Sequence, residues 1–242
     1  MAANTRRLSI VFPGIFDLIA NQDFDSFAVE FPFLARLIDR GAIEDDEALD
    51  LERAIVACFG IDLAEQDLFN SVELSAEVDS VPFSDRLVRA DPVHLRAVGT
   101  QLRLFSGSYF EPDAEESAAL LAELRPLFPE YKFYCGRFPG RWYIEFPGKV
   151  QFEAASITTI QQLAIEGRLP TGKNAKKAHV LMNEMQMALH QTDVNREREA
   201  NGLAPINSIW LWGLGPSLET RNGGGLNVWG DDVMSQALAK RC

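Results

Sequence analysis

The clearest pattern of apolar and polar positions in the chain predicts a helix over residues 181–190. Apolar side chains recur at helical spacing and would share one face of this helix, namely Leu181, Met182, Met185, Ala188 and Leu189. Asn183, Gln186 and His190 would lie on the opposite face. Neutral hydrogen-bonding groups need specific partners, whereas a solvated helix face usually carries lysine and glutamate. Two interpretations stay open: a ligand site, and a core helix whose amides hold a neighbouring loop.

The first part of the chain has the strand-then-helix order typical of α/β proteins. A short apolar run at residues 8–12 predicts a buried strand that ends at Pro13. Helices are predicted at 31–38, where Pro32 suits the first turn, and at about 49–59. Each is followed by a glycine, the residue that most readily adopts the backbone conformation after a helix end.

The middle of the chain predicts short strands with a single helix among them, and its end returns to alternating helix and strand. Short segments suit strands at 87–89, 102–105, 132–134 and 142–146, with one helix at 112–128 among them. The pattern then predicts a helix at 156–166, a strand at 206–212 and a last helix at 231–239.

We therefore predict an α/β fold with a mostly parallel sheet formed by both chain ends and an α+β insertion between them. The predicted α/β core comprises residues 1–70 and 156–242, and the insertion comprises 71–155.

Composition limits the classes of partner and the cellular compartment that suit this chain. The 242 residues carry a formal net charge of -12, which argues against nucleic acid and anionic membranes as partners. Three widely spaced cysteines predict no disulfide framework and no zinc site, which fits a cytoplasmic protein. We predict no signal peptide and no membrane span, because the first apolar run is short and is interrupted. No metal, cofactor or catalytic residue is predicted.

A second group of candidate residues surrounds Pro92. Arg89, Asp91 and His94 flank this proline and could hold a phosphate or carboxylate. Alternatively, Asp91 caps a turn at Pro92 and the arginines pair with carboxylates of this acidic protein. The same two interpretations apply to Arg141.

Several of these residues lie in segments that resemble a known family. Residues 89–95, 182–190 and 194–213 are similar to the proteobacterial regulator-of-pathogenicity-factors E type proteins. Those proteins resemble, more distantly, the archaeal-type 2,3-bisphosphoglycerate-independent phosphoglycerate mutase of the alkaline phosphatase superfamily. The distant likeness rests on three places: residues 10–17 with 31–41, residues 88–91 with 140–144, and residues 195–215.

The departures from the mutase pattern bear on the chemistry that the resemblance implies. In the mutase, an aspartate at the end of the first strand binds a catalytic metal, and Pro13 stands there in this chain. A hydroxyl nucleophile should follow the first helix, where this chain has the acidic run 44–47. The remaining metal ligands of the mutase lie in a part that the resemblance does not reach. In-line phosphoryl transfer needs all of these parts together.

The resemblance therefore implies a bacterial pseudoenzyme with a regulatory or binding role. Its ligand would be a phosphorylated three-carbon acid or a protein partner. The candidate ligand-binding residues are Arg89, Asp91, His94, Arg141, Asn183, Gln186, His190, Asn195 and Asn207. An alternative is an active metal-dependent mutase or phosphotransferase completed by a longer chain or a partner. In a third interpretation, the 181–190 helix is purely structural.

Overall fold

The computed structural model describes residues 11, 24–40, 51–61, 69–107, 110, 112–218, 228–230 and 232–241. Five strands in these ranges form one sheet: β1 (Leu87–Val98), β2 (Gln101–Phe105), β3 (Lys132–Cys135), β4 (Trp142–Glu145) and β5 (Ser208–Trp212). The order is β2-β1-β4-β3, and β5 also pairs with β1. All of these pairings are antiparallel.

Strand β1 is the centre of this sheet because three other strands pair along its length. Residues 87–89 pair with β4, residues 89–93 with β5 and residues 94–98 with β2. Pro92 lies in the section that pairs with β5 alone among the described strands. A proline is tolerated where one edge of a strand has no ladder to complete. The predicted turn at Pro92 is therefore wrong, and Asp91 caps no turn because the strand continues through both residues.

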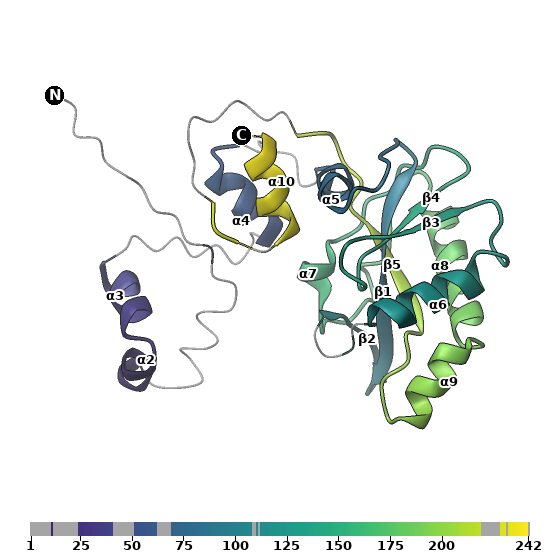
Figure 1. The fold of residues 1–242 in the computed structure, drawn as a ribbon, viewed down its shortest axis with the longest axis horizontal. Coiled ribbons are helices and arrows are strands. Elements are labelled where there is room, and N and C mark those ends of the chain that lie inside the picture. The colour runs from purple at the N-terminus through teal and green to yellow at the C-terminus, as the bar shows by residue number, and fades with distance from the viewer. Residues whose placement is uncertain are drawn as a thin grey trace.

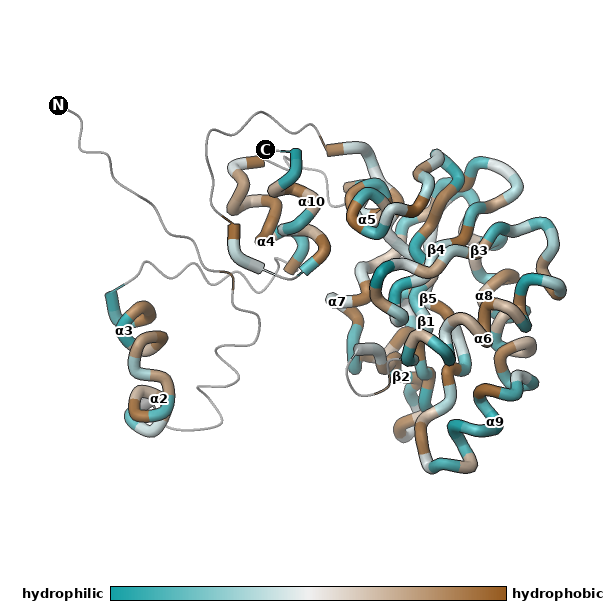
Figure 2. Tube along the Cα trace, in the orientation of Figure 1, coloured by the Kyte–Doolittle hydropathy of each residue, from teal (hydrophilic) through white to brown (hydrophobic). Residues whose placement is uncertain are grey.

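Helices cover both faces of the sheet. Figure 1 shows α6 (Ala114–Leu124), α8 (Ala175–Leu189) and α9 (Asp193–Ala200) on one side. It shows α5 (Ser71–Asp79) and the single turn α7 (Ile157–Ile160) on the other side. Helix α6 begins at a capping box in which Asp113 and Glu116 exchange hydrogen bonds. Most of α9 is hydrophilic, as Figure 2 shows, yet its buried Val194 lies in the main core.

A second, smaller core joins helices from distant parts of the chain. It lies between α4 (Leu51–Cys58), α5 and α10 (Val233–Arg241), and its buried residues are Ile55, Val56, Phe69, Leu74, Val78, Met234, Ala237 and Leu238. Arg241 at the end of α10 adds ion pairs to Glu73 and Glu77 on α5. Helix α5 also buries Val72 and Ala76 against the sheet, so it connects the two cores. Helices α2 (Phe24–Glu30) and α3 (Pro32–Arg40) contact each other.

Much of the predicted secondary structure is confirmed, including α3 with Pro32 at its first position, α4, α6, α8, α10 and strands β2 to β5. Strand β1 is confirmed only at residues 87–89, since it continues to Val98 through the predicted turn. The helix predicted at 156–166 is wrong in length, since α7 is a single turn. The sequence pattern does not predict helices α2, α5 and α9. None of the described helices is long and apolar enough to span a membrane.

The predicted parallel arrangement is wrong for the described strands. Strand β5, expected to return into a parallel core sheet, runs antiparallel to β1. A continuous apolar run indicates burial on both faces, and helices on both sides give that burial in an antiparallel sheet as well. The strand expected at 8–12 lies outside the described residues, so the division into core and insertion stays a prediction.

Close packing where β5 meets α5 gives a first testable prediction. Gly213 has a φ of 89°, and a Cβ there would lie 2.8 Å from Val72 Cγ2 and 3.0 Å from Ser71 Oγ. Gly99 in the β1–β2 turn has a φ of 62° but open space around it. Gly99→Ala should therefore lower the free energy of unfolding by the backbone cost alone, about 1–2 kcal/mol. Gly213→Ala should lower it by at least about 1 kcal/mol more.

Urea denaturation of both variants beside the wild type measures these losses. Equal losses for the two substitutions would contradict the tight contact between Gly213 and α5.

Candidate functional site

A row of three side chains crosses the sheet at the middle of β1. Arg89 lies directly opposite Tyr143 of β4 and Trp212 of β5, so the three share one face of the sheet. The guanidinium carbon of Arg89 lies 5.4 Å from the centre of the Tyr143 ring and 4.8 Å from that of Trp212. Both distances are typical of cation–π contacts. The sheet thus holds the Arg89 charge between two aromatic rings.

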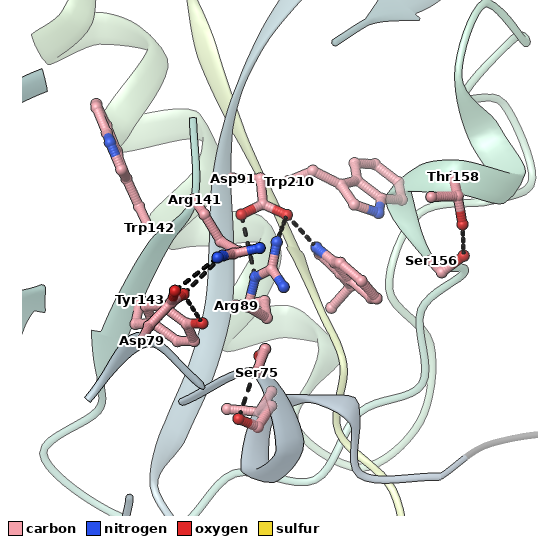
Figure 3. A network of polar contacts seen from close by, with 12 residues as sticks. Ser75, Asp79, Arg89, Asp91, Arg141, Trp142, Tyr143, Ser156, Thr158 and Trp210 are labelled. Carbon is pink, nitrogen blue, oxygen red and sulfur yellow. Dashed lines mark hydrogen bonds and ion pairs between the residues drawn. The ribbon is translucent and has the colours of Figure 1, made fainter. Parts of the chain in front are cut away.

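The charge of Arg89 is neutralised two residues further along the same strand. Asp91 accepts hydrogen bonds from Arg89 Nε at 3.1 Å and from Arg89 Nη2 at 2.7 Å, as Figure 3 shows. Trp212 Nε1 donates to the same carboxylate at 2.7 Å. Arg89 and Asp91 are both almost fully buried. Of the two open interpretations, the contacts match the one in which the arginine pairs with a carboxylate of the protein.

A second buried ion pair lies beside the first and connects α5 to the sheet. Asp79, near the end of α5, accepts hydrogen bonds from Arg141 Nε and Nη2, each at 2.6 Å. It also accepts from the Tyr143 hydroxyl at 2.6 Å and from the Arg137 backbone N–H at 3.1 Å. A Cβ on Gly136 would lie 2.3 Å from an Asp79 oxygen, so this approach requires glycine. Because Tyr143 contacts both Asp79 and Arg89, the two pairs form one network (Figure 3).

The electrostatics of this network follow from burial and pairing. Burial raises the pKa of Asp79, but hydrogen bonds from Arg141 and Tyr143 and the charge of Arg141 outweigh burial and hold that pKa below its usual value. Burial lowers the pKa of Arg89, but the charge and hydrogen bonds of Asp91, together with Tyr143 and Glu52, outweigh burial and hold that pKa above its usual value. Burial, opposed by the charge of Arg89, raises the pKa of Tyr143 well above its usual range. Both arginines are charged, both carboxyls are paired, and the tyrosine is a neutral donor.

Three other candidate residues hold the loop between α9 and β5. Asn195 donates to the backbone oxygens of Leu189 and Ile206 and accepts from the Ile206 N–H. Asn207 exchanges two hydrogen bonds with the backbone of Leu95, and His94 Nδ1 lies 2.8 Å from the Pro205 oxygen. These contacts satisfy buried backbone groups of an irregular segment. His94, Asn195 and Asn207 are thus brought together, but as supports of this loop.

The polar face of α8 has one specific partner among its three candidate residues. Gln186 donates to the Ser208 hydroxyl of β5 at 3.2 Å, which ties the helix to the sheet. Asn183 and His190 are exposed. The nine candidate residues are therefore distributed over three contact sets: the Arg89 network with Asp91 and Arg141, the loop supports, and the α8 face.

The structure adds residues that the sequence pattern did not single out. Asp79, Tyr143 and Trp212 complete the Arg89 network, and Arg198 fixes the loop region by hydrogen bonds to Ala204, Glu116 and Phe110. The positions of Tyr143 and Trp212 follow from strand register, which local pattern does not determine. Within the described ranges no three His, Cys, Asp or Glu side chains are grouped as a metal site. The network holds charges in place, and each of its carboxylates already accepts hydrogen bonds from an arginine of the chain.

Comparisons with known proteins point to one enzyme group. The chain is 34% identical over 110 residues to the 2,3-bisphosphoglycerate-independent phosphoglycerate mutase of Methanothrix thermoacetophila, a match covering 43% of this chain and 26% of that protein. It is 31% identical over 145 residues to mutase 2 of Methanothermobacter thermautotrophicus, covering 58% and 34%. A probable mutase of Geobacter sulfurreducens is 34% identical over 86 residues, covering 36% and 22%. No protein-family model matches the chain.

Among solved structures, the cofactor-independent phosphoglycerate mutase of Thermoplasma acidophilum aligns with a TM-score of 0.43 and 12% identity, over 72% of this chain and 48% of that one. The chain spans between about a fifth and a third of the length of the curated relatives that it matches. It is therefore similar to phosphoglycerate mutases over part of its length.

The Asp79–Arg141 pair gives a prediction about stability. Asp79→Asn leaves the buried Arg141 charge without a counter-ion, so the free energy of unfolding should fall by about 3–5 kcal/mol. The Lys149–Asp85 pair is a matched control, since its side chains are 61% and 65% exposed. Asp85→Asn should cost less than about 1 kcal/mol. Urea denaturation compares the two variants, and similar losses would contradict the importance of burial.

The lowered pKa of Asp79 gives a prediction about pH. A carboxyl whose pKa falls on folding stabilises the folded state fully above its unfolded pKa, and that contribution is lost as the pH falls through the folded pKa. The stability difference between wild type and Asp79→Asn should therefore be constant from pH 8 to about pH 5. It should shrink only below the ordinary value of 3.8. A difference that already closes near neutral pH would indicate a raised pKa instead.

Proposed function

We propose that this chain is a catalytically degenerate relative of phosphoglycerate mutases that acts in the cytoplasm by binding, as a regulatory or assembly protein. The observation that carries the proposal is the pairing of the two buried arginines with internal carboxylates. Arg89 is neutralised by Asp91, and Arg141 by Asp79. A phosphorylated acid would have to displace an aspartate from a buried bidentate contact, which is costly. A protein partner at the exposed surface requires no such exchange.

The sequence supports the same proposal. Proline cannot bind a metal ion, and Pro13 stands where the mutase resemblance expects a metal-binding aspartate. The resemblance of residues 182–190 and 194–213 to the regulator-of-pathogenicity-factors E type proteins supports a regulatory role. The exposed Asn183 and His190 on α8 remain candidate contact residues for a partner.

An active mutase or phosphotransferase is the second candidate function. The identities of 31–34% to phosphoglycerate mutases favour it. In that case the metal site would form with further chain or a partner, and purified protein should hold manganese or zinc tightly.

Calorimetric titration with 3-phosphoglycerate, with and without manganese, tests the proposal together with a mutase assay on the same preparation. We expect no turnover and no saturable heat, which corresponds to a dissociation constant above about 1 mM. Manganese-dependent turnover would contradict the proposal and favour the enzyme. Metal-independent binding that weakens in Arg89→Lys would place the phosphorylated acid in the Arg89 network.

A further inference from the structure

Two arginines face each other on the hairpin formed by residues 94–105 of β1 and β2, which we call the arginine hairpin. Arg96 is directly opposite Arg103 in the strand register, so their side chains leave the same face of the hairpin. Like charges in directly opposed positions destabilise a pair of strands. The arrangement is notable in a chain that has 35 acidic residues against 23 basic ones.

Within the described part of the chain, neither guanidinium has a carboxylate partner. Arg96 is exposed, and the contact of Arg103 is a long hydrogen bond of 3.4 Å from Nη2 to Gln101. Arg103 Nε is buried and has no hydrogen-bond partner among the described residues. The nearby Glu166 uses its carboxylate to accept the Leu102 N–H at 2.8 Å. The rest of the Arg103 guanidinium has no acceptor among the described residues except Gln101.

The hairpin also holds these charges in a defined place. The Arg96 guanidinium carbon lies 4.8 Å from the centre of the Phe105 ring, a stacking contact that limits its rotamers. On the same face, Val98 is 38% exposed and adds an apolar surface. Residues 163–165 cover the outer edge of β2 with backbone hydrogen bonds to Leu102 and Leu104. A partner would therefore meet side chains of this face, since it cannot add a strand to that edge.

We propose that the arginine hairpin binds an acidic segment of a protein partner through bidentate contacts from Arg96 and Arg103 to carboxylates. The proposal names the class of partner for the binding role proposed above, and rests on it. The charges are complementary, and arginine beside apolar surface is typical of protein interfaces. Small-molecule sites are concave, whereas the two arginines lie on one face of a two-stranded hairpin. A nucleic acid carries a charge on every nucleotide, so the net charge of -12 would repel it more strongly than a short acidic segment that also has apolar residues.

Fluorescence anisotropy with a short labelled peptide of glutamate and leucine tests the proposal on the full chain. The test variant is Arg96→Gln with Arg103→Gln. The control is Lys176→Gln with Lys177→Gln, which removes the same charge from exposed positions of α8. The hairpin variant should bind the peptide at least about tenfold more weakly, and the control should bind as the wild type does. A matching peptide of glutamine and leucine should not bind.

Thermal unfolding of the same variants separates binding from a structural role. The hairpin variant should be at least as stable as the wild type, because it removes a like-charge pair. Unchanged peptide binding, equal losses in both double variants, or a marked loss of stability in the hairpin variant would each overturn the proposal. Tighter binding of a single-stranded DNA oligonucleotide than of the peptide would also overturn it. A mutase assay on the same protein tests the proposed function separately. Turnover would contradict that function, whereas the binding and stability results above bear on the arginine hairpin.

Discussion

The arrangement of the sheet and its covering helix depends on burying two arginine–aspartate pairs side by side. A charge is taken out of water at a large cost unless its partner and its remaining hydrogen bonds are in place. Here Asp79 has four donors, and Arg89 has Asp91 together with two aromatic rings. Arg89 has these partners only where β1 lies between β4 and β5. Asp79 reaches its donors only where α5 lies over the same face of the sheet.

Helix α5 connects the two buried ion pairs to the second, smaller core. Its Asp79 end is held by the sheet, while Leu74 and Val78 form a core with α4 and α10. Segments before and after the sheet in the sequence are thus packed on one helix. The same network uses the side chains that an anionic ligand of the sheet would need. Arg89 and Arg141 are therefore occupied by internal aspartates, whereas Arg96 and Arg103 of the β1–β2 hairpin have no carboxylate partner among the described residues.

Sequence pattern predicted the local elements better than their long-range relations. The α8 helix and its buried face were predictable from spacing, but the partner of Gln186 was not. The Arg89–Asp91 pair lies within one strand, whereas Asp79 and Arg141 are 62 residues apart and meet through tertiary packing. Helix α5 is buried on most sides and leaves only Glu73 and Glu77 as a polar face, which is too narrow to reveal its period. The direction of β5 was not predictable because burial on both faces suits either orientation.

NMR signals of the arginine Nε–H groups test most directly whether these arginines are committed to internal carboxylates. We predict that the Nε–H signals of Arg89 and Arg141 exchange slowly with solvent, because both donate to buried aspartates. They should keep their positions when 3-phosphoglycerate is added in large excess. A shift of either signal that saturates with ligand would show that the carboxylate can be displaced, and would contradict the central claim.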